Sequence, residues 1–175
     1  MTQIDVEKIA GGFHGLTSVA GSYLLESYMV TMKQSKHKSG VVLSVPGKKK
    51  VKFELVWKKK VTKQMERSYR DQGIATEHAA ECLGILVAKE LTGFEVIERS
   101  VKKTGFDYWL GAKKRSVFQN MAKLECAGRF DVTGAPLRAL YKDKIEQMRQ
   151  SKHLPIPGYA AVTGFADPIL HFGKR

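Results

Sequence analysis

The chain has 175 residues, 43% of them hydrophobic, which excludes wholesale disorder and fits one folded domain. Its 30 Lys and Arg residues outnumber 17 Asp and Glu residues, and the net charge of +13 predicts a polyanionic partner, of which nucleic acid is the commonest. The alternatives are a basic, soluble surface or an acidic protein partner. Since no apolar run approaches the roughly 20 residues that span a bilayer, and the N-terminus lacks a signal-peptide core, we expect a cytoplasmic protein without membrane contact.

The first 75 residues are expected to form a basic extension packed on the rest of the chain. Residues 16–36 carry apolar side chains near helical spacing. Residues 39–47 predict a strand, and residues 48–60 alternate apolar side chains with lysines, as in a half-buried strand. These two strands are expected to pair as a hairpin. Residues 60–73 predict a short helix that ends near Gly73.

A third helix is predicted to follow Thr76, which is a good N-cap residue, and to stop at Gly93. The segment EHAAECLGILVAKEL is apolar almost all round, so this helix is expected to be well buried. Its Cys82 and the later Cys126 lack the spacing of a metal site, and we expect both to be buried, reduced thiols.

The remaining chain predicts strands in FEVIERS, GFDYWLG and AKLECAGRF, then an amphipathic helix after Pro136, then a strand in YAAVTGF. The resulting order for residues 76–175 is α-β-β-β-α-β. Three strands joined by short links favour an antiparallel meander, and a helical crossover allows the fourth strand to pair in parallel. The expected fold is therefore α/β (α+β), with a mixed sheet and helices on its faces.

Two acids, Asp107 and Glu125, lie in neighbouring predicted strands. Because alternate residues of a strand share a face, Glu125 is expected to project with Lys123, Ala127 and Arg129. Two adjacent carboxylates repel each other unless a cation lies between them, and oxygen ligands suit a hard divalent ion, Mg²⁺ or Mn²⁺. The alternative is that each acid forms an ordinary ion pair with a nearby basic side chain.

This element order, with an acid on the second strand and another on the third, resembles the PD-(D/E)xK nuclease superfamily over about residues 76–166. The segments TGFDYWLG and AKLECAGR also look like a signature of small bacterial proteins of unassigned function. The resemblance implies a restriction endonuclease-like core and Mg²⁺-dependent phosphodiester hydrolysis in phage defence or DNA repair, often by a homodimer. It assigns the catalytic acids to Asp107 and Glu125, with Glu77 or Glu81 of the first helix assisting.

The chain departs from the family pattern at two positions. Ala127 stands where the family has a lysine, and Phe106 replaces the usual proline before Asp107. Lys123, on the same strand face as Glu125, is the candidate to activate water instead. The alternatives are a catalytically inactive subunit that binds nucleic acid or a partner protein in a larger complex, and a protein-interaction module with structural acids.

Basic side chains fill the predicted turn between the two acid-bearing strands. Lys113, Lys114 and Arg115 occupy this turn, and Arg129 follows the second acid. Phosphate contacts are expected here, largely independent of base sequence and weakened by salt. The alternative is a solvated set of lysines that blunts a sheet edge. For the runs at 48–50 and 58–60 both interpretations stay open.

Overall fold

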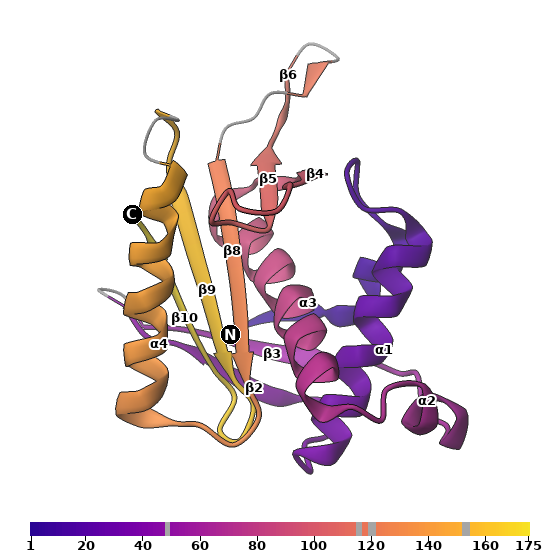
Figure 1. Cartoon of the computed structure of the whole chain (residues 1–175). Helices are drawn as coiled ribbons and strands as arrows, with labels where there is room; N and C mark the ends of the chain where they lie inside the picture. Colours follow the sequence, from indigo (N-terminus) through magenta and orange to yellow (C-terminus); the bar gives the residue numbers. More distant parts are fainter. Residues whose placement is uncertain (48–49, 115–116, 119–121, 152–154) are drawn as a thin grey trace.

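The computed structural model has a mixed α/β fold built on one large sheet (Figure 1). It describes residues 1–47, 50–114, 117–118, 122–151 and 155–175, with backbone alone for residues 113–114, 117–118 and 150. Within these residues, no helix is long and apolar enough to span a bilayer. The expected mixed sheet with helices on its faces is therefore confirmed.

The elements follow one another closely along the chain. The strands of the large sheet are β1 (Thr2–Asp5), β2 (Val41–Val45), β3 (Val51–Val56), β4 (Glu95–Arg99), β5 (Tyr108–Gly111), β8 (Ala122–Arg129), β9 (Gly158–Gly164) and β10 (Ile169–Lys174). A separate small ladder contains β6 (Lys113–Lys114) and β7 (Val117–Phe118). The helices are η1 (Val6–Gly11), α1 (Ser18–Gln34), α2 (Lys63–Ser68), α3 (Gln72–Thr92), α4 (Gly134–Gln147) and η2 (Met148–Ser151).

The pairing of the later strands agrees with the predicted topology. Within the described residues the sheet has the order β1-β3-β2-β10-β9-β8-β5-β4. β4, β5 and β8 pair antiparallel, and β9 lies parallel to β8 after the chain has crossed over through α4. The antiparallel meander and the parallel crossover are both confirmed.

The N-terminal strands extend this same sheet instead of forming a separate one. β2 and β3 pair as the predicted hairpin. β10 pairs antiparallel with β9 and contacts β2 in parallel, so it joins the hairpin to the later strands. The sequence did not predict β10 or β1. β1 has four residues and β10 is interrupted by Gly173, so neither has a clear apolar alternation.

The boundaries of two helices differ from the expectation. α3 begins at Gln72, where the Asp71 carboxylate accepts a hydrogen bond from the Ile74 amide at 2.9 Å, so Thr76 is a buried residue inside the helix and not its N-cap. α2 correspondingly ends at Ser68. The predicted stop at Gly93 is confirmed, with a φ of 73° that favours glycine.

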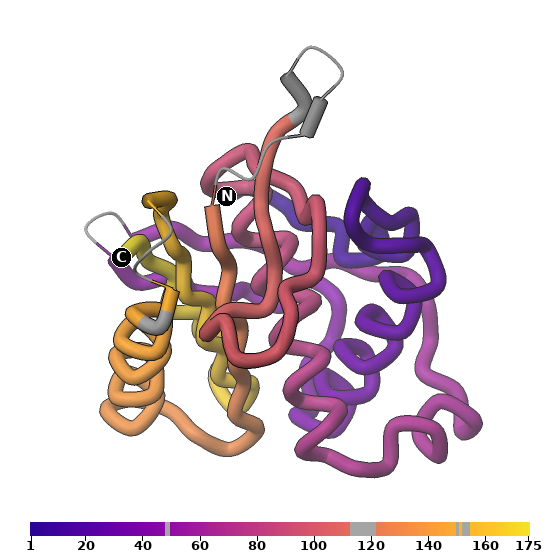
Figure 2. The backbone as a smooth tube through the Cα atoms, turned by 45° about the horizontal axis from the view of Figure 1, so that its top comes forward, coloured from indigo at the N-terminus to yellow at the C-terminus, as the bar shows by residue number. Residues whose placement is uncertain are grey.

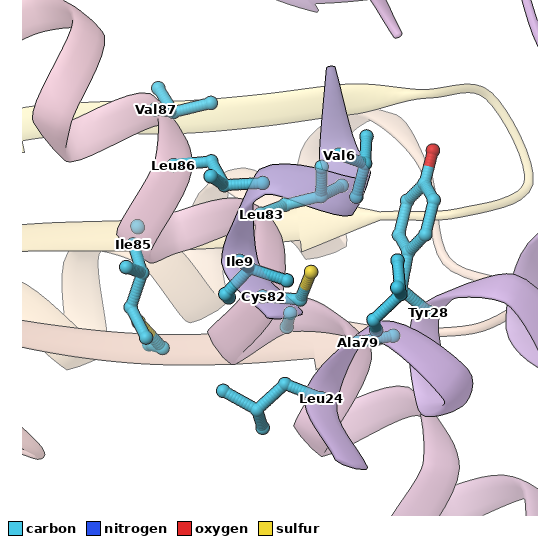
Figure 3. Close-up of a cluster of buried hydrophobic side chains, with 14 of the residues drawn as sticks. Val6, Ile9, Leu24, Tyr28, Ala79, Cys82, Leu83, Ile85, Leu86 and Val87 are labelled. Atoms are coloured by element: carbon cyan, nitrogen blue, oxygen red, sulfur yellow. The ribbon is translucent and has the colours of Figure 1, made fainter. Parts of the chain in front are cut away.

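The hydrophobic core lies around α3, which is buried almost all round as predicted. One side of α3 packs against α1 and η1, and the other packs against β8 and β9. Figure 3 shows side chains of η1, α1 and α3 meeting in one cluster, among them Val6, Ile9, Leu24, Tyr28, Cys82 and Leu83. Cys82 and Cys126 are both buried and free, as expected.

α4 lies on the opposite face of the sheet from α3, and both Figure 1 and Figure 2 show the strands between them. A Cβ atom at Gly128 would come within 2.8 Å of Ala80 on α3, and one at Gly164 would come within 2.8 Å of Leu137 on α4. Helices therefore cover both faces of the sheet at β8 and β9, and Glu125 of β8 faces α4, where it pairs with Lys144.

Candidate active site

A pocket of about 300 Å³ lies between α3, α4 and the strands β5 and β8. Charged side chains dominate its lining: Glu77, Glu81, Asp107, Glu125, Arg129 and Lys144. Four carboxylates therefore share this pocket with two cations. The structure brings together both strand acids and both helix acids that the sequence singled out.

Asp107 directly precedes β5 and is fixed to β8 through both its backbone and its side chain. Tyr108 pairs with Leu124, and continuing this register sets Asp107 opposite Glu125. The Asp107 amide donates to the Leu124 carbonyl, and its Oδ2 accepts a hydrogen bond from the Cys126 amide, both at 2.8 Å. These bonds hold the carboxylate at the pocket wall.

Burial, the negative charge of Glu125 and, to a smaller extent, Glu81 together raise the pKa of the Asp107 carboxyl to about 7. The Cys126 amide and the Lys144 ammonium oppose this shift. A carboxyl group that titrates near neutral pH beside a second acid is typical of sites that bind a cation or transfer a proton.

Glu125 is held by two side chains from α4. Its Oε1 accepts hydrogen bonds from the Lys144 ammonium at 2.6 Å and from the Gln147 amide at 3.2 Å. The Glu125 side chain is only 4% exposed, and Lys144 is 23% exposed. A charge-assisted hydrogen bond that is this well shielded from solvent holds both side chains firmly in place.

The sequence analysis did not single out Lys144, although its spacing carries a signal. Lys144 lies seven residues after Leu137 and four before Met148, and both of these side chains are buried. A lysine inside the buried stripe of a helix needs an acidic partner on the surface that the helix covers. That partner is Glu125.

Glu81 belongs to a second hydrogen-bonded group on the α3 side of the pocket. Its carboxylate pairs with Arg99 at 3.1 Å and accepts a short hydrogen bond from the Tyr108 hydroxyl. Arg99 also donates to the Tyr108 hydroxyl at 2.8 Å. Glu77, one turn earlier on α3, is exposed. Glu81 is thus already neutralised by Arg99, whereas Glu77 faces solvent.

The other predicted site residues lie in different places. Lys123 is buried, and its ammonium donates to the carbonyl and the hydroxyl of Ser151, both at 3.2 Å, so it is not part of the pocket lining. Arg129 does line the pocket. For Lys113 and Lys114 only the backbone is described, in β6, and Arg115 lies outside the described residues.

Two oxygen atoms of the pocket are available to a further ligand. Within the part of the chain that the structure describes, no hydrogen bond reaches Asp107 Oδ1 or Glu125 Oε2. The same residues contain no group of three or more His, Cys, Asp and Glu side chains arranged to hold a metal ion. A cation here would therefore have two protein ligands and complete its coordination with water or substrate oxygens, as Mg²⁺ commonly does.

No family model, no curated protein and no solved structure matches this chain significantly.

Proposed function

We propose that this protein is a metal-dependent phosphodiesterase that cleaves nucleic acid, with DNA favoured. The observation that supports the proposal most is the convergence of Asp107 and Glu125 in one pocket, with the Lys144 ammonium bonded to Glu125. The order α3-β4-β5-β8-α4-β9, with β8 and β9 parallel, is the order that the resemblance to PD-(D/E)xK nucleases leads us to expect.

The residues of the pocket fit a hard divalent cation. Asp107 Oδ1 and Glu125 Oε2 are carboxylate oxygens, which Mg²⁺ and Mn²⁺ prefer. Burial and repulsion by Glu125 raise the pKa of Asp107, and a cation between the two carboxylates would relieve the repulsion. When bound, the metal would supply Lewis-acid polarisation of the phosphate and a more acidic water.

The side chains around the two acids support hydrolysis in distinct ways. Lys144 is fixed by Glu125 and supplies the pocket with a lysine, which Ala127 on β8 does not. Its ammonium has three protons, so it can bond Gln147, Glu125 and one further oxygen of water or phosphate. Arg129, at the end of β8, is a natural phosphate ligand.

In the reaction, water forms a bond to phosphorus, the bond to the leaving sugar oxygen breaks, and one proton passes to that oxygen.

Nicking of supercoiled plasmid tests this proposal. We expect the wild type to nick DNA with Mg²⁺ or Mn²⁺ and not with EDTA. Asp107→Asn, Glu125→Gln and Lys144→Gln should each lower the rate at least about 100-fold, because each removes a group that the reaction needs. Glu146→Gln and Lys142→Gln are matched controls, since both residues are exposed on α4 and neither lines the pocket. Their rates should stay within about twofold of the wild type.

The second candidate is a subunit of the same fold that binds nucleic acid or a partner protein without cleaving. The observation in its favour is Ala127, together with the two α4 side chains that already occupy Glu125 Oε1. Salt-dependent DNA binding by a wild type that nicks nothing with either metal would reject the enzyme and favour this candidate. A protein that neither nicks nor binds DNA would reject the enzyme and the nucleic-acid-binding subunit, and would favour a subunit that binds a partner protein.

A further inference from the structure

We propose that a second pocket, at the C-terminal end of α1, binds the phosphodiester backbone of the nucleic acid. We call it the lysine pocket, and define it by Lys33, Lys38, Lys58, Lys59, Lys60 and Trp57, which are among its lining residues. Its volume is about 550 Å³. The choice of nucleic acid as its ligand rests on the function proposed above, whereas the pocket itself is independent of the two acids.

The lysines of this pocket are only partly neutralised. Lys33 pairs with Glu66 at 2.6 Å, and Lys59 pairs with Glu26 at 2.9 Å. Among the residues that the structure describes, no carboxylate lies within ion-pair distance of Lys38, Lys58 or Lys60. Lys38 and Lys60 therefore line this concave surface without an ion pair among the described residues, and Lys58 interacts with Glu7 only beyond ion-pair distance. A surface of this kind attracts a chain of phosphates.

The backbone that carries these lysines is held in place, as a binding surface requires. The Glu7 carboxylate accepts hydrogen bonds from the amides of Lys58 at 2.7 Å and Lys59 at 2.6 Å. These amide bonds lower the pKa of Glu7, so it stays ionised at neutral pH. The Trp57 amide donates to the Ser39 hydroxyl at 2.9 Å, which ties the two sides of the pocket together. The lysines are thus presented from a fixed segment.

A chain of hydrogen bonds connects the lysine pocket with the pocket that contains Asp107 and Glu125, here called the acidic pocket. His37, which lines the lysine pocket, bonds through Nε2 to the Phe165 carbonyl at 2.7 Å. The Phe165 amide donates to the Arg129 carbonyl at 3.1 Å, and Arg129 lines the acidic pocket. One lining residue of each pocket is therefore bonded to Phe165, which directly follows β9. We infer that a strand with a phosphate at Arg129 extends toward the lysines.

Binding of a 5′-hydroxyl oligonucleotide of 20 nucleotides, measured by anisotropy in EDTA, tests this proposal. In the variant with Lys38, Lys58 and Lys60 changed to Gln, affinity at 100 mM salt should fall at least about tenfold. The slope of log K against log salt should fall by about 2 to 3, since each phosphate contact contributes ~0.7–0.9. The matched control changes Lys8, Lys52 and Lys174 to Gln, three exposed lysines outside this pocket. Its affinity should change less than threefold.

A local readout separates this pocket from a general loss of charge. In Trp109→Phe protein, Trp57 is the remaining tryptophan, and its emission should change on oligonucleotide binding but not in the lysine variant. Equal losses in the two triple variants, or an unresponsive Trp57, would overturn the proposal. So would capture of phosphatidylserine vesicles without oligonucleotide binding. The binding assay contains no metal and is therefore independent of the nicking assay. A wild type that binds the oligonucleotide but does not nick plasmid rejects only the proposed enzyme. A wild type that nicks plasmid, with a lysine variant of unchanged affinity, rejects only this inference.

Discussion

At the scale of single residues, the environment of Asp107 decides its chemistry. A carboxyl group at the start of a strand is ordinarily ionised at neutral pH. Here burial and the neighbouring Glu125 both disfavour the charge, and the Cys126 amide compensates only in part. Burial, together with the strand pairing that sets Asp107 opposite Glu125, therefore raises the pKa of this carboxyl group.

The pH dependence of stability should reveal this raised pKa. The folded protein keeps the Asp107 proton up to pH about 7, whereas the unfolded chain releases it near 3.8. The resulting stability is fully present below the lower value and is lost as pH rises through the higher one. Asp107→Asn removes this titration and retains an acceptor for the Cys126 amide.

We therefore expect Asp107→Asn to gain stability relative to the wild type as pH rises from 4 to 8, in urea unfolding without divalent metal. Glu146→Gln, at an exposed position on α4, should show no such trend. A stability difference between Asp107→Asn and wild type that stays constant over this range would contradict the assigned pKa.

At the scale of elements, α3 positions the site because it approaches the sheet closely. A Cβ atom at Gly84 would come within 2.6 Å of Cys126 Sγ and 3.2 Å of Ala161 Cβ. Only glycine allows this approach, which brings Glu77 and Glu81 over the end of β8. Sequence periodicity predicted the buried helix and the two faces of β8, since both follow from local geometry.

Overpacking at Gly84 should therefore destabilise the protein despite the higher helix propensity of alanine. We expect Gly84→Ala to lower the free energy of unfolding by about 1–3 kcal/mol, because the new methyl group meets Cys126 Sγ. Cys126→Ala removes that sulfur, so the loss of unfolding free energy in the double variant should be smaller than the sum of the losses in the two single variants. Strict additivity in urea unfolding would show that the two positions do not touch.

At the scale of the whole molecule, the N-terminal and C-terminal parts share one sheet and one core. β10 links the N-terminal hairpin to β9, and α1 packs on α3. Figure 3 shows Val6 and Leu24 in the same cluster as Leu83. The site is therefore supported by residues on both sides of position 75, which the sequence suggested as a boundary.

The two tryptophans allow a test of this shared core. Trp57 follows β3 in the N-terminal part, and Trp109 lies on β5 beside the pocket. In urea, Trp109→Phe protein reports on Trp57 and Trp57→Phe protein reports on Trp109. For each variant, fluorescence and circular dichroism should give the same midpoint of unfolding, as in a two-state transition. Comparing the two probes on one variant removes the effect of the substitution itself on stability. Two separated transitions would indicate independent domains.

The sequence by itself determined the order of the later elements, the buried α3, and the neighbouring strands at Asp107 and Glu125, because these follow from local periodicity and short links; Asp107 directly precedes β5 instead of lying within the predicted strand. The tertiary structure alone decided that Lys144 meets Glu125, that Lys123 pairs with Ser151, and that Arg99 neutralises Glu81. Each of these contacts joins side chains 18 to 28 residues apart. Their geometry depends on how α3 and α4 lie on the sheet, which no local pattern specifies.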